Sequence, residues 1–77
     1  MTNEVFKNDY IQRMKNEREA LLDKIRKLLE FTESKIYISG LDPFTKEIMM
    51  MQLGSMEVYA RCLAVRIALS EKGNPPE

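Results

Sequence analysis

The strong helix breakers of this 77-residue chain are confined to a few places. Glycine and proline, which disfavour the interior of a helix, occur only at Gly40, Pro43, Gly54, Gly73, Pro75 and Pro76. Two long segments on either side of a centre near residue 38 are therefore left largely free of them. This layout predicts an all-α fold, a two-helix antiparallel hairpin that forms a single domain over residues 1–77.

The first segment predicts a helix from about residue 4 to residue 34. Its apolar positions recur at the three- and four-residue spacing of one helical face; they are Tyr10, Ile11, Met14, Leu21, Leu22, Ile25, Leu28, Leu29 and Thr32. Alternatively, Asn8 or Asp9 could cap a helix that begins at Tyr10. In that case residues 3–7 would form a short separate N-terminal turn or helix.

Residues 35–42 predict a linker that folds back, so that Tyr37 and Leu41 cover the end of the hairpin. Asp42 followed by Pro43 predicts the start of the second helix, because the aspartate can accept from free backbone N–H groups and proline has no N–H to lose. This helix is expected over residues 43–72. Gly73 and the prolines behind it predict its end and leave residues 73–77 as a disordered tail.

The second helix carries two apolar series. One contains Met49, Gln52 or Leu53, Met56, Tyr59 or Ala60, Leu63, and Arg66 or Ile67; the other contains Met51, Ser55, Val58, Cys62, Val65 and Leu69. They are offset by two residues, about 200° around an ideal helix, so only one series can face the first helix. Because monomers rarely expose a continuous apolar row, we predict a homo-oligomeric helical bundle in which Cys62 is a small buried hydrophobe. Small residues would allow close helix approach; they are Gly54, Ser55, Ala60, Ala64 and Ala68.

The composition argues against enzyme chemistry. The chain has no histidine and one cysteine, Cys62, so the usual zinc ligands and the histidine-dependent nucleophile pairs are missing. Three consecutive methionines, Met49, Met50 and Met51, point in three directions on a helix, which favours packing over a copper site. We therefore expect no catalytic residues, no cofactor and no metal site.

Charge and hydropathy indicate the expected location of the chain and the partners it is not expected to bind. Twelve basic and twelve acidic residues are interspersed, which provides no basic face for a nucleic-acid polymer. No segment approaches the roughly eighteen apolar residues of a membrane span, and the first residues do not resemble a secretory signal. A lone cysteine requires no oxidising compartment, so a cytoplasmic protein is expected.

Some polar residues lie within the apolar faces. If the hairpin turns near residue 38, facing residue numbers sum to about 76, which places Tyr10 opposite Arg66 and Glu17 opposite Tyr59. The simplest interpretation is a Tyr59–Glu17 hydrogen bond and an Arg66 stem along Tyr10, a polar layer that fixes the register.

The basic residues suggest an alternative. Most have an acid at helical spacing; the expected pairs are Asp9–Arg13, Lys15–Glu19, Asp23–Lys27, Arg26–Glu30, Asp42–Lys46 and Glu57–Arg61. Arg18, Lys24 and Arg66 have no acid three or four residues away, so water, an acid of another subunit or an anionic ligand must meet their charge. With Tyr10 and Tyr59 as stacking surfaces, these five residues form a candidate pocket for a nucleotide-like anion.

The order of residues over positions 10–69 resembles a large family of small phage proteins related to a protein of a crAss-like phage. The resemblance is carried by Arg13-Met14, Glu17, Leu21, Lys24-Ile25, Lys27-Leu28, Phe31, Leu41, Met49, Gln52-Leu53, Met56, Tyr59, Leu63 and Arg66-Ile67. It implies a phage protein made in the cytoplasm of an infected bacterium. In architecture and size the chain is also similar to phage anti-defence sponges, short helical hairpins that oligomerise and sequester immune signalling nucleotides between subunits.

These similarities imply a non-catalytic sponge for a cyclic oligonucleotide or an ADP-ribose derivative, which would blunt CBASS or Thoeris signalling. Arg18, Arg66 and Lys24 would hold phosphates, and Tyr10 and Tyr59 would stack on bases. Two alternatives remain open. One is an oligomeric interaction module that blocks a host protein through the Met51–Leu69 series, and the other is a structural phage accessory protein.

Overall fold

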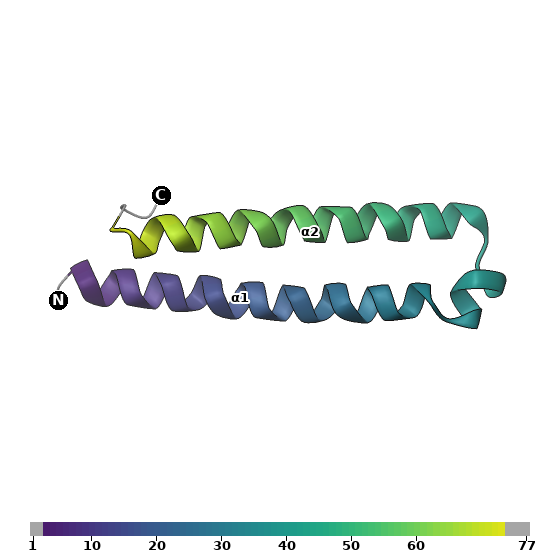
Figure 1. Cartoon of the computed structure of the whole chain (residues 1–77), viewed down its shortest axis with the longest axis horizontal. Coiled ribbons are helices and arrows are strands. Elements are labelled where there is room, and N and C mark those ends of the chain that lie inside the picture. Colours follow the sequence, from purple (N-terminus) through teal and green to yellow (C-terminus); the bar gives the residue numbers. More distant parts are fainter. Residues whose placement is uncertain (1–2, 74–77) are drawn as a thin grey trace.

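The chain folds into two long antiparallel helices joined at one end (Figure 1). The computed structural model describes the backbone of residues 3–73 and the side chains of residues 8–73. Helix α1 spans Asn3–Thr32, a single π-helical turn η1 spans Ile36–Gly40, and helix α2 spans Pro43–Glu71. The hairpin is a rod with extents of 56 × 16 × 15 Å. The predicted all-α hairpin is confirmed, and the described residues contain no strand.

Helix α1 is continuous from Asn3. The alternative in which residues 3–7 form a separate turn is therefore wrong, since Asn8 and Asp9 lie inside the helix instead of capping it. The helix ends at Thr32, two residues before the predicted end, where the Ser34 hydroxyl donates to the Phe31 carbonyl at 2.7 Å. This local bond competes with the helical pattern of the backbone.

The linker is more ordered than its sequence indicated. The N–H of Ile38 donates to the Ser34 carbonyl at 3.0 Å and the Ser39 hydroxyl to the Lys35 carbonyl at 2.9 Å, which holds η1 together. Tyr37 packs edge-on against Phe31 of α1, with ring centroids 6.1 Å apart. Tyr37 and Leu41 are half-buried at the end of the hairpin, where both were expected.

Helix α2 begins at the predicted cap. Asp42 Oδ2 accepts from the Thr45 N–H at 3.2 Å, and Pro43 occupies the first turn. Gly73, with φ 96°, adopts the left-handed conformation that suits glycine behind a helix. The predicted disordered tail, residues 73–77, lies outside the described residues from residue 74 on.

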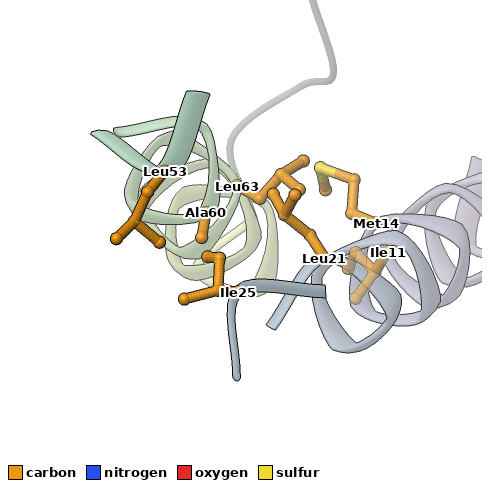
Figure 2. Close-up of a cluster of buried hydrophobic side chains, with 7 residues drawn as sticks. All are labelled: Ile11, Met14, Leu21, Ile25, Leu53, Ala60 and Leu63. Atoms are coloured by element: carbon orange, nitrogen blue, oxygen red, sulfur yellow. The ribbon is translucent and has the colours of Figure 1, made fainter. Parts of the chain in front are cut away.

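The core is one seam between the two helices. Ile11, Met14, Leu21 and Ile25 of α1 face Leu53, Ala60 and Leu63 of α2 (Figure 2). Leu63 is completely buried, and half-buried Tyr10, Leu28, Met56 and Ile67 surround the seam. The first apolar series of the second helix therefore faces α1, as predicted.

The second apolar series forms what we call the outer row. It consists of Phe44, Ile48, Met51, Ser55, Val58, Cys62, Val65 and Leu69, all exposed. The structure extends the predicted series to Phe44 and Ile48, near the start of α2. Cys62 is exposed in the single chain, on the side of α2 that faces away from α1, so its predicted burial depends on the predicted oligomer. Among the described helices, none combines the length and hydropathy needed to cross a membrane.

We predict that Leu63→Ala lowers the free energy of unfolding by about 2 to 5 kcal/mol, because it removes a completely buried side chain and leaves a cavity in the seam. Leu29→Ala is the matched control, since Leu29 is 42% exposed, and it should cost less than about 1 kcal/mol. Urea denaturation followed by circular dichroism measures both. Equal losses would show that the seam does not hold the hairpin together.

The Asp42 cap predicts a pH dependence. Hydrogen bonds from the Thr45 hydroxyl and then the Thr45 N–H hold the pKa of Asp42 below its ordinary value of 3.8, so the stabilisation is present at neutral pH and is lost as the pH falls through the folded-state pKa. Asp42→Asn keeps a capping oxygen but does not titrate. The stability of the wild type should therefore fall relative to this variant below pH 3.8, as measured by thermal denaturation at several pH values. A constant difference would contradict the assigned cap.

Candidate functional site

The first polar contact across the hairpin joins Tyr10 and Arg66. The Arg66 guanidinium carbon lies 5.7 Å from the centroid of the Tyr10 ring, and Nη2 donates to the Tyr10 hydroxyl. This geometry combines a cation–π contact with a hydrogen bond. The register that places these residues opposite each other is confirmed.

The second polar contact joins Glu17 and Tyr59. The Tyr59 hydroxyl donates to Glu17 Oε2, as the same register predicts. Tyr59 is 43% exposed, so its ring remains partly open to solvent while its hydroxyl is engaged. The two contacts are one heptad apart on both helices, and together they fix the register of α1 against α2.

A groove containing Arg18 lies between α1 and α2. It has a volume of about 520 Å³ and is lined by Lys15, Arg18, Glu19, Leu22, Ala64 and Ile67. Arg18 is half-buried, and its Nε atom is buried with no hydrogen-bond partner among the described residues. We call this the Arg18 groove. Its apolar walls and its incompletely satisfied guanidinium distinguish it from an ordinary solvated surface.

Lys15 at the rim of this groove has a different partner from the predicted one. Its Nζ lies 2.8 Å from Glu71 Oε2 at the end of α2, where Glu19 on its own helix was expected. The antiparallel arrangement brings the end of α2 alongside the first half of α1, a contact that the spacing within one helix does not reveal. The groove is lined by two cations, Lys15 and Arg18. Lys15 forms an ion pair with Glu71, whereas Arg18 forms no ion pair with a carboxylate among the described side chains.

The five predicted site residues do not form one pocket within a single chain. Tyr10, Glu17 and Lys24 are seven residues apart and share one flank of α1, on which Tyr59 and Arg66 of α2 meet Glu17 and Tyr10. We call this the aromatic flank; Lys24 on it is exposed. Arg18 follows Glu17 by one residue, a rotation of about 100°, which carries it across the seam to the Arg18 groove.

The other charged residues of α1 are largely paired with one another. Arg13 and Asp9 are 3.0 Å apart, and Lys27 and Asp23 are 3.1 Å apart, as predicted. The predicted Arg26–Glu30 pair is also present, at 2.6 Å. The hydrogen bond from Arg26 and then that from Lys27 lower the pKa of Asp23. Within the described part of the chain, no three histidine, cysteine, aspartate or glutamate side chains group in a way that could hold a metal ion.

Sequence reasoning missed the partners of Arg18. Lys15 and Leu22 are seven residues apart on the flank opposite the aromatic flank, and Ala64 and Ile67 approach from α2. The sequence contained part of this signal, because Lys15 and Leu22 share a helical face while Arg18 has no acid at helical spacing. It did not show which side of the seam that face would occupy.

Comparison with protein families identifies the chain. A family model described as Sequestin matches residues 8–69. The chain belongs to the Sequestin family. The match spans the aromatic flank, the Arg18 groove and the whole outer row of this Sequestin chain. No curated protein and no solved structure gives a significant match, and the resemblance to crAss-like phage proteins stays a prediction.

We predict that Tyr59→Phe and Glu17→Gln are energetically coupled. Tyr59→Phe removes the hydroxyl donor, and Glu17→Gln replaces the charged acceptor with a weaker neutral amide oxygen. A double-mutant cycle should therefore give a coupling of about 0.5 kcal/mol, the charge-dependent part of a contact open to solvent. The measurement is the free energy of unfolding of the wild type, both single variants and the double variant. Tyr37→Phe combined with Glu17→Gln is the control and should show additivity; equal coupling in both cycles would contradict the assignment.

Proposed function

We propose that this chain is a sponge that binds a small anionic nucleotide and sequesters it without changing it. The family name, Sequestin, points to sequestration of a molecule. The observation that carries the proposal is Arg18, whose Nε is buried without a hydrogen-bond partner among the described residues and which lines an apolar groove. An anion that accepts from this guanidinium would satisfy it.

The chemistry of the Arg18 groove suits a nucleotide. A guanidinium recognises phosphate oxygens through paired N–H donors. Leu22, Ala64 and Ile67 supply the apolar surface against which a base or ribose would lie. Glu19 at the rim limits the net positive charge of the groove, which favours a ligand with few phosphates over a polyanion.

The aromatic flank supplies the other predicted contacts. Tyr10 and Tyr59 offer rings for stacking on bases, and Arg66 and Lys24 offer cations. In one hairpin this flank and the Arg18 groove lie on different sides of the seam. A ligand that touches both must therefore lie between two chains, which is why we place the site at a subunit boundary of a homo-oligomer.

The resemblance to phage sponges directs the choice of ligand. We propose a cyclic oligonucleotide or an ADP-ribose derivative of the kind that carries CBASS or Thoeris signals in the cytoplasm of an infected bacterium. The chain has no histidine, and its single cysteine is exposed on the outer row. We therefore propose that the ligand is held intact, with no catalytic step.

The outer row favours a second candidate function. Its exposed apolar side chains could instead bind and block a host protein, because an unpartnered apolar face marks an interaction surface. This alternative predicts no stabilisation by nucleotides.

We expect cyclic dinucleotides, cyclic trinucleotides or cyclic ADP-ribose isomers to raise the melting temperature of the purified protein. A ligand at a hundred times its dissociation constant adds about 2.7 kcal/mol to the free energy of unfolding. Arg18→Ala should abolish the rise because it removes the guanidinium from the groove. Differential scanning fluorimetry measures the shift, and chromatography of the heat-released ligand tests whether it is unchanged.

Arg26→Ala is the matched control. Arg26 is on the same helix but is exposed and paired with Asp23 and Glu30, so the ligand-induced shift should remain. Absence of a shift with all of these nucleotides would contradict the sponge proposal. A shift that survives Arg18→Ala would move the site away from the groove, and recovery of a cleaved ligand would overturn the proposal of intact sequestration.

A further inference from the structure

The outer row follows an uninterrupted heptad pattern. Its members alternate steps of four and three residues from Phe44 to Leu69, along nearly the whole of α2. Phe44, Met51, Val58 and Val65 are each seven residues apart and are 68%, 63%, 55% and 54% exposed. Such a repeat is the seam by which one helix packs against another in a coiled coil. The partner of this seam is therefore a helix that offers a similar repeat.

The residues that border the outer row determine which helix fits. One border carries Glu47, Gly54, Arg61 and Ala68, and the other carries Thr45, Gln52, Tyr59 and Arg66. Border residues of two paired helices approach each other across the seam. A second copy of α2 offers the same apolar repeat and the same two borders. The border charges of one copy can therefore be matched against those of the other for a parallel and for an antiparallel pair.

Charge disfavours the in-register parallel arrangement. In a parallel pair, each residue of the Glu47 border meets the residue of the partner's Thr45 border that is five positions further along the sequence. Arg61 of each chain would then face Arg66 of the other, and this like-charge contact would occur twice. An antiparallel pair instead brings each border against the same border of the partner.

We propose that two copies of this chain pair through their outer rows as antiparallel α2 helices, with a two-fold axis near Gly54. In this register Glu47 of each chain faces Arg61 of the other, giving two opposite-charge pairs, and Gly54 faces Gly54. A shift of the pairing by one heptad would leave Glu47 opposite Ala68. A shift by two heptads would place Arg61 of one chain against Arg61 of the other. Only the proposed register uses both charges.

The surface around Gly54 fits a close approach at this axis. A groove of about 600 Å³ is lined by Met51, Gly54, Ser55 and Val58, and a β-carbon added to Gly54 would meet no atom within 4 Å apart from its chain neighbours and the adjacent backbone of α2. Small residues let two helices pack closely. The groove thus lies where the seam of the partner would cross it.

The register specifies which side chains of the outer row meet. Phe44 lies against Cys62 of the other copy, Ile48 against Val58, and Met51 against Ser55, while Val65 and Leu69 extend beyond the overlap of the two α2 helices. Since the outer row faces away from α1, the two hairpins form a flat layer in the order α1, α2, α2, α1. This inference rests on the proposed self-association but does not depend on the proposed ligand.

Cys62 is a built-in reporter of the register. The variant Phe44→Cys should cross-link through its new thiol to Cys62 of the other copy with a short bis-maleimide. The product is a covalent dimer on a denaturing gel, and mass spectrometry should recover a peptide pair that joins position 44 to Cys62. Met51→Cys and Val58→Cys report the registers shifted by one and two heptads, and the wild type reports parallel pairing. Dominant cross-linking in any of these three, or in none of the four proteins, overturns the proposal.

Charge exchange provides an independent test. Glu47→Arg and Arg61→Glu alone should each raise the dimer dissociation constant by about tenfold, since two symmetric pairs become repulsive together. The combined E47R/R61E chain should return to within about threefold of the wild type, whereas Glu30→Arg on the exposed side of α1 should change nothing. Sedimentation velocity measures all four. Failure of the double variant to recover, or a wild type that remains monomeric at millimolar concentration, overturns the proposal.

The two proposals fail separately. Nucleotide titration of the same variants shows whether ligand binding follows the dimer. A dimer of the proposed register that binds no nucleotide would remove the sponge function and leave this inference intact. A monomer that binds nucleotide through Arg18 would do the opposite.

Discussion

The packing of α2 against α1 through one seam determines which side chains the two helices present on each side of the hairpin. Leu63, completely buried, fixes which side of α2 is turned inward. Once that side is fixed, Tyr59 and Arg66 fall on one flank, Ala64 falls on the other, and the outer row lies on the side away from α1. A helix has only one rotation that buries its inner series, so these surfaces cannot be chosen independently.

Much of the fold could be predicted from the sequence, because its determinants are local. The placement of glycine and proline indicated two helices, and the Asp42-Pro43 pair marked the start of α2. A turn near residue 38 was enough to predict both long-range contacts, Tyr10–Arg66 and Glu17–Tyr59. The π-helical turn was not predictable in the same way, because it depends on packing of Tyr37 against Phe31 and on hydrogen bonds from individual side chains.

The candidate site was less predictable, because it depends on which side of a seam a residue occupies. Arg18 was identified from its lack of a nearby acid, yet it was grouped with residues of the aromatic flank. Arg18 directly follows Glu17, and the rotation of about 100° between adjacent residues carries it to the other side of the seam. The Lys15–Glu71 ion pair was missed for a related reason, since its partners meet only after the chain has folded back. Spacing within a helix predicts neighbours on that helix and gives little information on neighbours across it.

Gly54 has a consequence for how this sequence can evolve. A glycine in the middle of a helix costs about 1 kcal/mol relative to alanine, and the single hairpin has open space where an alanine methyl group would lie. Selection for a stable hairpin alone would therefore replace it readily. Retention of glycine at this position among related chains would therefore point to a constraint that arises outside the individual hairpin.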